Sequence, residues 1–96
     1  MIAGSDANTT YGVANADVIV TGIAGHSDLT GDRTYTLSTV GAGDGDMIEF
    51  RNYDATYKIT VSGYGEIRSA AGKYNVRSFI YIGGAWYVYA SVPFDA

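Results

Sequence analysis

Residues 79–89 read FIYIGGAWYVY, a run that holds the only Trp of the chain and three of its nine Tyr. A Gly-Gly pair between two segments rich in aromatic and β-branched residues predicts a β-hairpin. The reason is that both central positions of a tight turn need positive φ angles, which glycine adopts without strain. With a two-residue turn at Gly83 and Gly84, each residue of one strand has a defined partner on the other, and partners share a face.

Both faces of this hairpin are apolar. One face carries Phe79, Tyr81, Trp86 and Val88, and the other carries Ile80, Ile82, Ala85, Tyr87 and Tyr89. The second face continues backward as an apolar stripe to residue 74, so we expect it to lie on the chain's own core. The first face turns polar beyond the hairpin, which is typical of a local contact with a neighbour. We therefore predict that the first face, from Phe79 to Val88, forms an interface between copies of the chain.

The length and composition favour self-association. A chain of 96 residues is one domain with a small core, and such domains are often reinforced by disulfides, metals or oligomerisation. The sequence has no Cys, which rules out disulfides and thiolate metal sites, and one His cannot form a zinc cluster alone. Burial of each large apolar side chain contributes on the order of 1.5–3 kcal/mol. Oligomerisation is therefore the expected means of stabilisation.

The charge pattern argues against two classes of partner. The chain has 6 basic and 10 acidic side chains, and its basic residues are scattered along the sequence, whereas nucleic-acid-binding proteins concentrate theirs. No apolar run approaches the ~20 residues of a membrane span, and the amino terminus lacks the basic and apolar parts of a signal peptide. We expect neither a nucleic-acid partner nor a membrane partner.

The fold class follows from residue types and alternation. Val, Ile, Thr and Tyr are abundant, while Leu and Glu occur twice each, which predicts an all-β protein. Strands are predicted at residues 17–21, 33–37, 47–51, 56–61 and 73–82, with a short strand or turn at 66–68 and the second hairpin strand after 84. Alternation within 33–37 and 47–51 predicts that Tyr35, Leu37, Ile48 and Phe50 point inward. Segments 47–51 and 56–61 flank a four-residue loop and predict a second hairpin. The expected architecture is a small antiparallel β-sandwich or barrel of six to seven strands.

Residues 1–15 differ from the rest of the chain, because they are small, polar and without periodicity. Two interpretations remain open: a frayed terminus, or an extended N-terminal arm that becomes ordered on a partner surface. The domain organisation is then an arm at 1–15 and a single β-domain at 16–96. In the second interpretation the sizeable apolar residues Ile2, Tyr11 and Val13 make the contact.

The sequence holds no motif that predicts catalysis, a metal or a cofactor. Asp44 and Asp46 alternate as calcium ligands do, but no Glu follows at the required spacing, so turn chemistry explains them. Asp28 and Asp32 receive the same interpretation. His26 lies in a glycine-containing loop and is expected to be solvated, without a nucleophile placed to form a triad. Nothing selects a carboxylate pair for glycosidic cleavage among ten acids, so a glycan-cleaving enzyme is only a third hypothesis and we predict no enzyme.

Four short features together resemble a known class of domain. They are the Thr-rich strand at 33–37, a Gly45-Asp46 pair leading into a strand, the alternating segment Lys58–Val61, and the terminal hairpin with Gly-Gly-Ala-Trp-Tyr-Val. Over roughly residues 17–91 the chain resembles the small β-domains of tailed-phage virion proteins, which occur in capsid decoration (cement) proteins and in tail- or head-fibre modules. The resemblance implies a trimer of β-domains on a virus particle, without catalysis.

The resulting hypothesis is a structural virion protein. We expect a homotrimer that binds the outside of a phage capsid, contacts the major capsid protein through residues 1–15 and stabilises the particle. A chain that begins at Met1 and spans 96 residues favours a standalone decoration protein over a module of a long fibre. The alternative is a fibre receptor-binding module that recognises bacterial surface glycan through exposed Tyr side chains.

Overall fold

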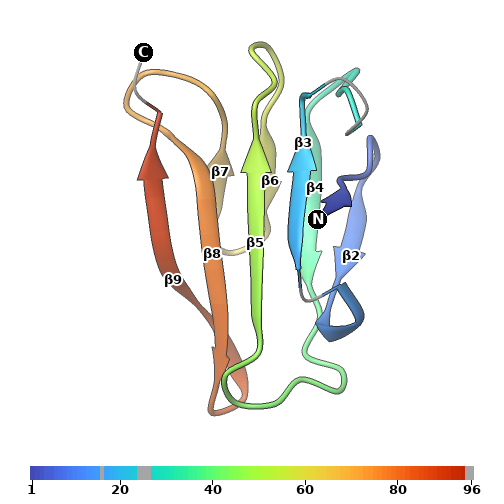
Figure 1. Ribbon diagram of the computed structural model, residues 1–96, viewed down its shortest axis with the longest axis vertical. Coiled ribbons are helices and arrows are strands. Elements are labelled where there is room, and N and C mark those ends of the chain that lie inside the picture. The colour runs from blue at the N-terminus through green and yellow to red at the C-terminus, as the bar shows by residue number, and fades with distance from the viewer. Residues whose placement is uncertain (16, 24–26, 95–96) are drawn as a thin grey trace.

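The computed structural model describes residues 1–15, 17–23 and 27–94, and within these ranges the protein is all-β, as predicted (Figure 1). The larger sheet contains β1 (Ile2–Ala3), β3 (Val18–Thr21), β5 (Met47–Asn52), β8 (Tyr74–Ile82) and β9 (Ala85–Pro93). The smaller sheet contains β2 (Thr9–Tyr11), β4 (Arg33–Leu37), β6 (Ile59–Val61) and β7 (Gly65–Ile67). One short 3-10 turn, η1 (Val13–Asn15), follows β2. The described residues thus form nine strands, more than the six to seven expected, because the first fifteen residues contribute two.

The sheets are mixed rather than antiparallel. In the larger sheet β1, β3 and β5 run parallel, and β8 and β9 are added antiparallel in the order β1-β3-β5-β8-β9. In the smaller sheet β2, β4 and β6 run parallel and β7 is antiparallel to β6. Parallel neighbours need a crossover connection, and here each crossover is a strand of the other sheet. The antiparallel expectation was wrong for this reason, and the two open sheets do not form a closed barrel.

The predicted hairpin between residues 47–51 and 56–61 is also wrong. Both segments contain strands, but β5 lies in the larger sheet and β6 in the smaller one. The chain crosses between them at Asn52, whose buried side-chain amide donates hydrogen bonds to the carbonyls of Tyr57 (3.1 Å) and Ile67 (2.9 Å). Its Oδ1 accepts from the Thr21 hydroxyl (2.9 Å) and the Asp54 amide (3.0 Å). A buried polar residue with all four bonds made fixes the crossing.

The first fifteen residues do not form an arm separate from the domain. β1 pairs in parallel with β3, and β2 pairs in parallel with β4. Tyr11 is only 4% exposed, and its ring lies edge-on to Tyr35 (4.8 Å between centroids) and Phe50 (5.6 Å). One aromatic residue at the end of β2 thus places this strand in the core, although the segment around it is polar.

Polar contacts hold the connection between β1 and β2. Asp6 accepts hydrogen bonds from the Thr30 amide (3.0 Å) and hydroxyl (2.8 Å) and pairs with Arg33 Nε (2.9 Å). Asn8 Oδ1 accepts from the Thr34 amide at 2.9 Å. The hydrogen bonds from Thr30, and then that from Arg33, lower the pKa of Asp6 to about 2. The connection between β1 and β2 is therefore bound to the loop before β4 and to β4 itself.

The core lies between the two sheets. Aromatic rings run through it in contact: Tyr35 packs on Phe50 (5.4 Å), Phe50 on Phe79 (5.9 Å) and Phe79 on Tyr64 (5.2 Å). The other buried apolar members are Tyr11, Ile19, Leu29, Ile48, Ile59, Val61, Ile67 and Trp86. Both sheets contribute to this single cluster, so the alternation predicted for residues 33–37 and 47–51, with Tyr35, Ile48 and Phe50 inward, is confirmed.

The hairpin at residues 79–89 is confirmed in its register. β8 and β9 are antiparallel, with Tyr81 opposite Trp86 and Phe79 opposite Val88. Gly83 and Gly84 have φ angles of 59° and 94°, as a two-residue turn between twisted strands requires. A register shift between Ser78 and Phe79 lengthens β9 by one residue there. In Figure 1 the hairpin turn lies at the bottom, and β9 forms the outer side of the larger sheet.

Candidate interaction surface

The structure corrects the predicted interface at Phe79, Tyr81, Trp86 and Val88. Phe79 is fully buried, Trp86 is 3% exposed, and the indole Nε1 donates to the Ser38 carbonyl at 2.9 Å. Tyr81 packs on Trp86, with 5.4 Å between ring centroids, and joins the edge of the core. Only Val88, at 40% exposure, remains open to a partner. The face predicted to meet a neighbour is the face that meets the chain's own core.

The pairing with β5 decides which face of the hairpin points inward. Ile48 lies opposite Phe79 in the antiparallel ladder, and both residues are buried. Cross-strand partners share a face. Because the Ile48 side of β5 points inward, the Phe79 side of β8 points inward as well. Two apolar faces cannot be told apart by periodicity, and a one-residue change in pairing exchanges them. The outward face is therefore that of Ile80, Ile82 and Tyr87.

An apolar row crosses the outer face of the larger sheet. Met47 on β5 lies opposite Ile80 on β8, and Ile80 lies opposite Tyr87 on β9. Met47 and Tyr87 are exposed, with Tyr87 at 54%, and Ile82 at the end of β8 is exposed beside them. The prediction that the hairpin presents exposed apolar surface is thus retained, but on different residues from those expected.

The outer strand of this sheet extends the apolar surface. Among the described residues β9 pairs with β8 alone, so no strand covers its other edge, although the Trp86 carbonyl there accepts a hydrogen bond from the Tyr64 hydroxyl (2.6 Å). Tyr89 is 62% exposed, and Val88 and Val92 are exposed near it. Residues 85–93 contain no charged side chain, and Pro93 stands only at the very end. Lys, Glu and Pro are the usual residues that keep an edge strand from pairing with another chain, and most of β9 lacks them.

The residues expected to contact a capsid lie elsewhere in the fold. Tyr11 is in the core, and Ile2 in β1 and Val13 in η1 are half-buried and pack against the same core. Their side chains therefore stabilise the domain to which they belong.

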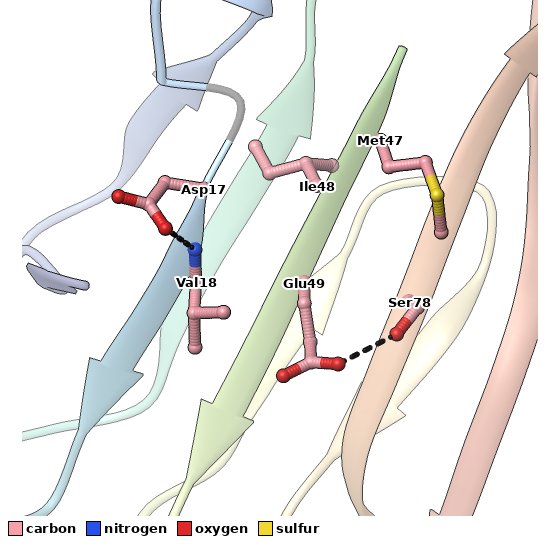
Figure 2. Close-up of a pocket in the computed structure, with 6 residues that line it drawn as sticks. All are labelled: Asp17, Val18, Met47, Ile48, Glu49 and Ser78. Carbon is pink, nitrogen blue, oxygen red and sulfur yellow. Dashed lines mark hydrogen bonds between the residues drawn. The ribbon is translucent and has the colours of Figure 1, made fainter. Parts of the chain in front are cut away.

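A shallow hollow of about 230 Å³ lies beside the apolar row (Figure 2). Its acidic side chains already have partners. Glu49 accepts from the Ser78 hydroxyl (2.9 Å) and pairs with Arg51 (2.6 Å). Asp17 accepts from the Val18 amide (2.7 Å) and the amino terminus (3.0 Å), and its pKa is lowered first by the Val18 amide. These carboxylates therefore organise the surface. The lining residues are Asp17, Val18, Met47, Ile48, Glu49 and Ser78.

The other acidic residues singled out in the sequence make turn contacts. Asp46 accepts from the Gly43 amide (2.8 Å), and Asp44 accepts from the Gly83 amide (2.9 Å), which ties its loop to the hairpin turn. Asp32 accepts from the Lys58 amide at 3.0 Å. His26 lies outside the described residues. Within the described part of the chain no three His, Cys, Asp or Glu side chains converge as metal ligands would.

Sequence reasoning missed a cluster of basic side chains. Lys58, Arg68 and Lys73 all lie within 3.6–3.7 Å of the Glu66 carboxylate, although they are spread over sixteen residues of sequence. Desolvation acts to raise the pKa of Glu66, but the three positive charges outweigh it and hold that pKa below its usual value. The one available signal was the polar face of residues 73–77. Lys58 lies in the loop before β6 and Arg68 in the turn after β7, so both reach Glu66 from other parts of the sequence.

Comparison with protein-family models, curated proteins and solved structures gives no match to this chain. Over the described residues, no helix is long and apolar enough to cross a membrane. The functional interpretation therefore depends on the surfaces just described and on the sequence resemblance.

Proposed function

We propose that this protein is a structural virion protein, a phage capsid decoration protein built as a small β-sandwich that acts as a homo-oligomer. The observation that carries the proposal is the uncharged β9 strand, which is exposed at the edge of the larger sheet, with the apolar row of Met47, Ile80 and Tyr87 next to it. The phage assignment is supported by the resemblance of residues 17–91 to virion β-domains.

Self-association follows from two costs that a lone chain bears. Exposed Tyr and Val side chains on β9 leave apolar area in water, at about 25 cal/mol per Å². The free edge of β9 presents a row of backbone groups that a second strand can pair with. A second copy removes both costs with the same surface. Pairing of β9 with β9 gives a two-fold dimer, whereas packing of the apolar rows around a three-fold axis gives the trimer that the resemblance implies.

Oligomerisation also suits attachment to a particle. Several weak contacts made by linked copies act together, so modest contacts with the major capsid protein produce tight binding. Because Tyr11 is buried and Ile2 and Val13 pack against the core, we assign capsid contact to exposed surface rather than to these three side chains. Deletion of residues 2–15 would remove two strands and the buried Tyr11, so it is unsuitable as a test of capsid binding.

Light scattering after size exclusion tests self-association. At micromolar concentration we expect a mass of two or three times the 10.2 kDa of one chain, with three supporting the decoration-protein assignment. A folded, monodisperse monomer at these concentrations would contradict the proposal.

A binding experiment tests the virion assignment separately. Capsids of the virus whose genome carries this gene, prepared without the protein, are incubated with it and sedimented. We expect saturation at a fixed number of copies per capsid and a higher temperature of capsid disruption. Sedimentation of the capsids without the protein would contradict the assignment and leave self-association as a separate result.

The alternative function, a fibre module that recognises bacterial surface glycan, is favoured by one observation. Tyr74 is exposed and its ring lies beside the guanidinium of Arg77, 5.3 Å from Arg77 Cζ to the ring centroid. Binding of the fluorescent-labelled protein to host cells, reduced by Tyr74→Ala, would support this alternative. Cells left unlabelled would contradict it.

A further inference from the structure

The basic residues of this acidic chain are gathered in one place. Lys58, Arg68, Lys73 and Arg77 lie on or next to β6, β7 and β8, around Glu66. Of the six basic residues only Arg33 and Arg51 lie elsewhere, whereas nine of the ten acidic residues do. A chain with net charge −4 thus carries one region of positive charge. In Figure 1 the β7–β8 connection lies at the upper left, next to the end of β9.

One carboxylate does not neutralise this region. Glu66 faces Lys58, Arg68 and Lys73 at 3.6–3.7 Å, beyond hydrogen-bonding distance, and Arg77 adds a fourth positive charge nearby. Exposed ion pairs at such distances are weak and leave their lysines free to turn toward another anion. The region therefore keeps a net attraction for negative charge.

Arg77 is held in a fixed position next to an aromatic ring. Its Nη1 donates to the Tyr64 carbonyl (2.9 Å), and its Nε donates to the Ser91 hydroxyl (3.1 Å). Its Nη2 makes no hydrogen bond to a residue that the structure describes. The guanidinium lies over the Tyr74 ring, a cation–π arrangement that also fixes the tyrosine. Tyr74 remains 42% exposed, so part of its ring is available to a ligand.

These groups border a hollow of about 330 Å³ between β7 and the beginning of β8. Gly72 adds no side chain to the wall of this hollow, and a Cβ added there would meet no heavy atom within 4 Å. The volume is close to the lower end of that of small-molecule sites. The lining residues are Gly65, Glu66, Gly72, Lys73, Tyr74 and Arg77.

We propose that this hollow is a binding site for an acidic saccharide, a sugar that carries a carboxylate or phosphate group. Lys73 and Arg77 bind the anionic group, the exposed part of the Tyr74 ring packs on the sugar, and Glu66 accepts from a sugar hydroxyl. A bare anion would not pack on the tyrosine ring, and a neutral sugar would not be attracted by the excess positive charge. None of the residues that line the hollow belongs to the apolar row, although Arg77 bonds Ser91 on β9.

The test is an NMR titration of the amide signals of the ¹⁵N-labelled protein. The probes are glucuronic acid and glucose 6-phosphate, with glucose and inorganic phosphate as the neutral-sugar and anion-only controls. We expect saturable shifts at residues 65–66 and 72–77 for both acidic sugars, with dissociation constants on the order of millimolar for single sugar units. Glucose and phosphate should each bind about tenfold more weakly or worse.

Two variants identify the groups responsible. Lys73→Glu should weaken both acidic sugars about tenfold, and Tyr74→Ala should weaken both sugars while leaving the response to phosphate unchanged. The matched control is Tyr53→Ala, because Tyr53 is exposed to a similar extent and does not line the hollow. The amide spectrum of each variant in the absence of ligand shows whether its fold is intact. Arg77→Lys, which keeps the charge, replaces any variant that does not fold and should lose part of the affinity.

Three outcomes would overturn the proposal. They are an absence of shifts with both acidic sugars at 50-fold excess over the ~1 mM expected constant, equal binding of phosphate and acidic sugar, or a change in oligomer mass on Lys73→Glu. The second would show a charged surface without sugar recognition. The third would show that the basic cluster binds the acidic surface of a second copy of this chain. None of these outcomes depends on capsid binding.

Discussion

The side-chain amide of Asn52, at the end of β5, donates a hydrogen bond to the backbone carbonyl of Ile67 in β7, and the two atoms are 2.9 Å apart. This bond joins the larger sheet to the smaller one through a buried polar side chain. The same side chain bonds Thr21, Asp54 and Tyr57, so one residue connects β3, β5, the loop after β5 and β7. It stands where the chain leaves one sheet and enters the other.

Replacement of this residue should weaken the whole domain. Asn52→Leu has a similar volume but leaves the carbonyls of Tyr57 and Ile67 without donors in the interior. Unsatisfied buried groups cost about 1–3 kcal/mol each, so we expect a loss of about 2–4 kcal/mol in the free energy of unfolding. Urea denaturation followed by circular dichroism measures it. The control is Asn75→Leu on β8, which is only half-buried and should change stability by about 0.5 kcal/mol or less. Equal losses in the two variants would contradict the role given to Asn52.

The second prediction separates core from surface at two adjacent residues. Trp86→Ala removes a buried indole and should lower the free energy of unfolding of the single chain by about 3–5 kcal/mol. Tyr87→Ala, next to it on the outward face, should leave that free energy nearly unchanged and reduce self-association. Both quantities come from thermal unfolding and light scattering over a range of protein concentrations. A stable monomeric Trp86→Ala variant would contradict the inward placement of the indole.

The third prediction concerns the edge strand. A charge placed on β9 should oppose pairing with another copy, because a lysine buried between two strands loses its hydration. We expect Tyr89→Lys and Val92→Lys each to raise the dissociation constant of the oligomer about tenfold or more, equivalent to about 1.4 kcal/mol. Sedimentation equilibrium measures the constant. Thr36→Lys, on an exposed position of β4 in the other sheet, is the control. Unchanged association in all three variants would remove β9 from the interface.

Local features of this fold could be predicted, and their long-range arrangement could not. The Gly83-Gly84 turn fixed the register of the hairpin, and alternation placed Tyr35 and Phe50 inward. Alternation defines the two faces of a strand but does not name its partner strand. The chain alternates between sheets at residues such as Asn52, and no hydrophobic pattern marks that crossing. The second hairpin was mispredicted for this reason.

The candidate surfaces show the same limit. Both faces of residues 79–89 are apolar, so only the pairing of Phe79 with Ile48 shows which one is inside. Tyr11 directs β2 into the core from a polar segment that by composition resembles a free terminus. The basic cluster needs β6, β7 and β8 to be assembled before its members meet at Glu66. Each of these outcomes depends on contacts between residues far apart in the sequence.

The last prediction is a pH dependence that arises at Asp6. Its pKa is lowered to about 2, first by the hydrogen bond from the Thr30 amide and then by the Thr30 hydroxyl and Arg33, against an ordinary value of 3.8. A carboxylate whose pKa is lower in the folded state stabilises the fold fully above pH 3.8. It loses that contribution as the pH falls from about 4 to about 2. Asp6→Asn should therefore lower stability at pH 6 and flatten the fall in stability between pH 4 and pH 2. Chemical denaturation at several pH values measures both effects.

Asp28→Asn, an exposed carboxylate in the loop before β4, is the control and should leave the profile as it is. If Asp6→Asn and the wild type lose stability in parallel through this range, the contacts that hold the N-terminal segment do not involve the ionised carboxylate.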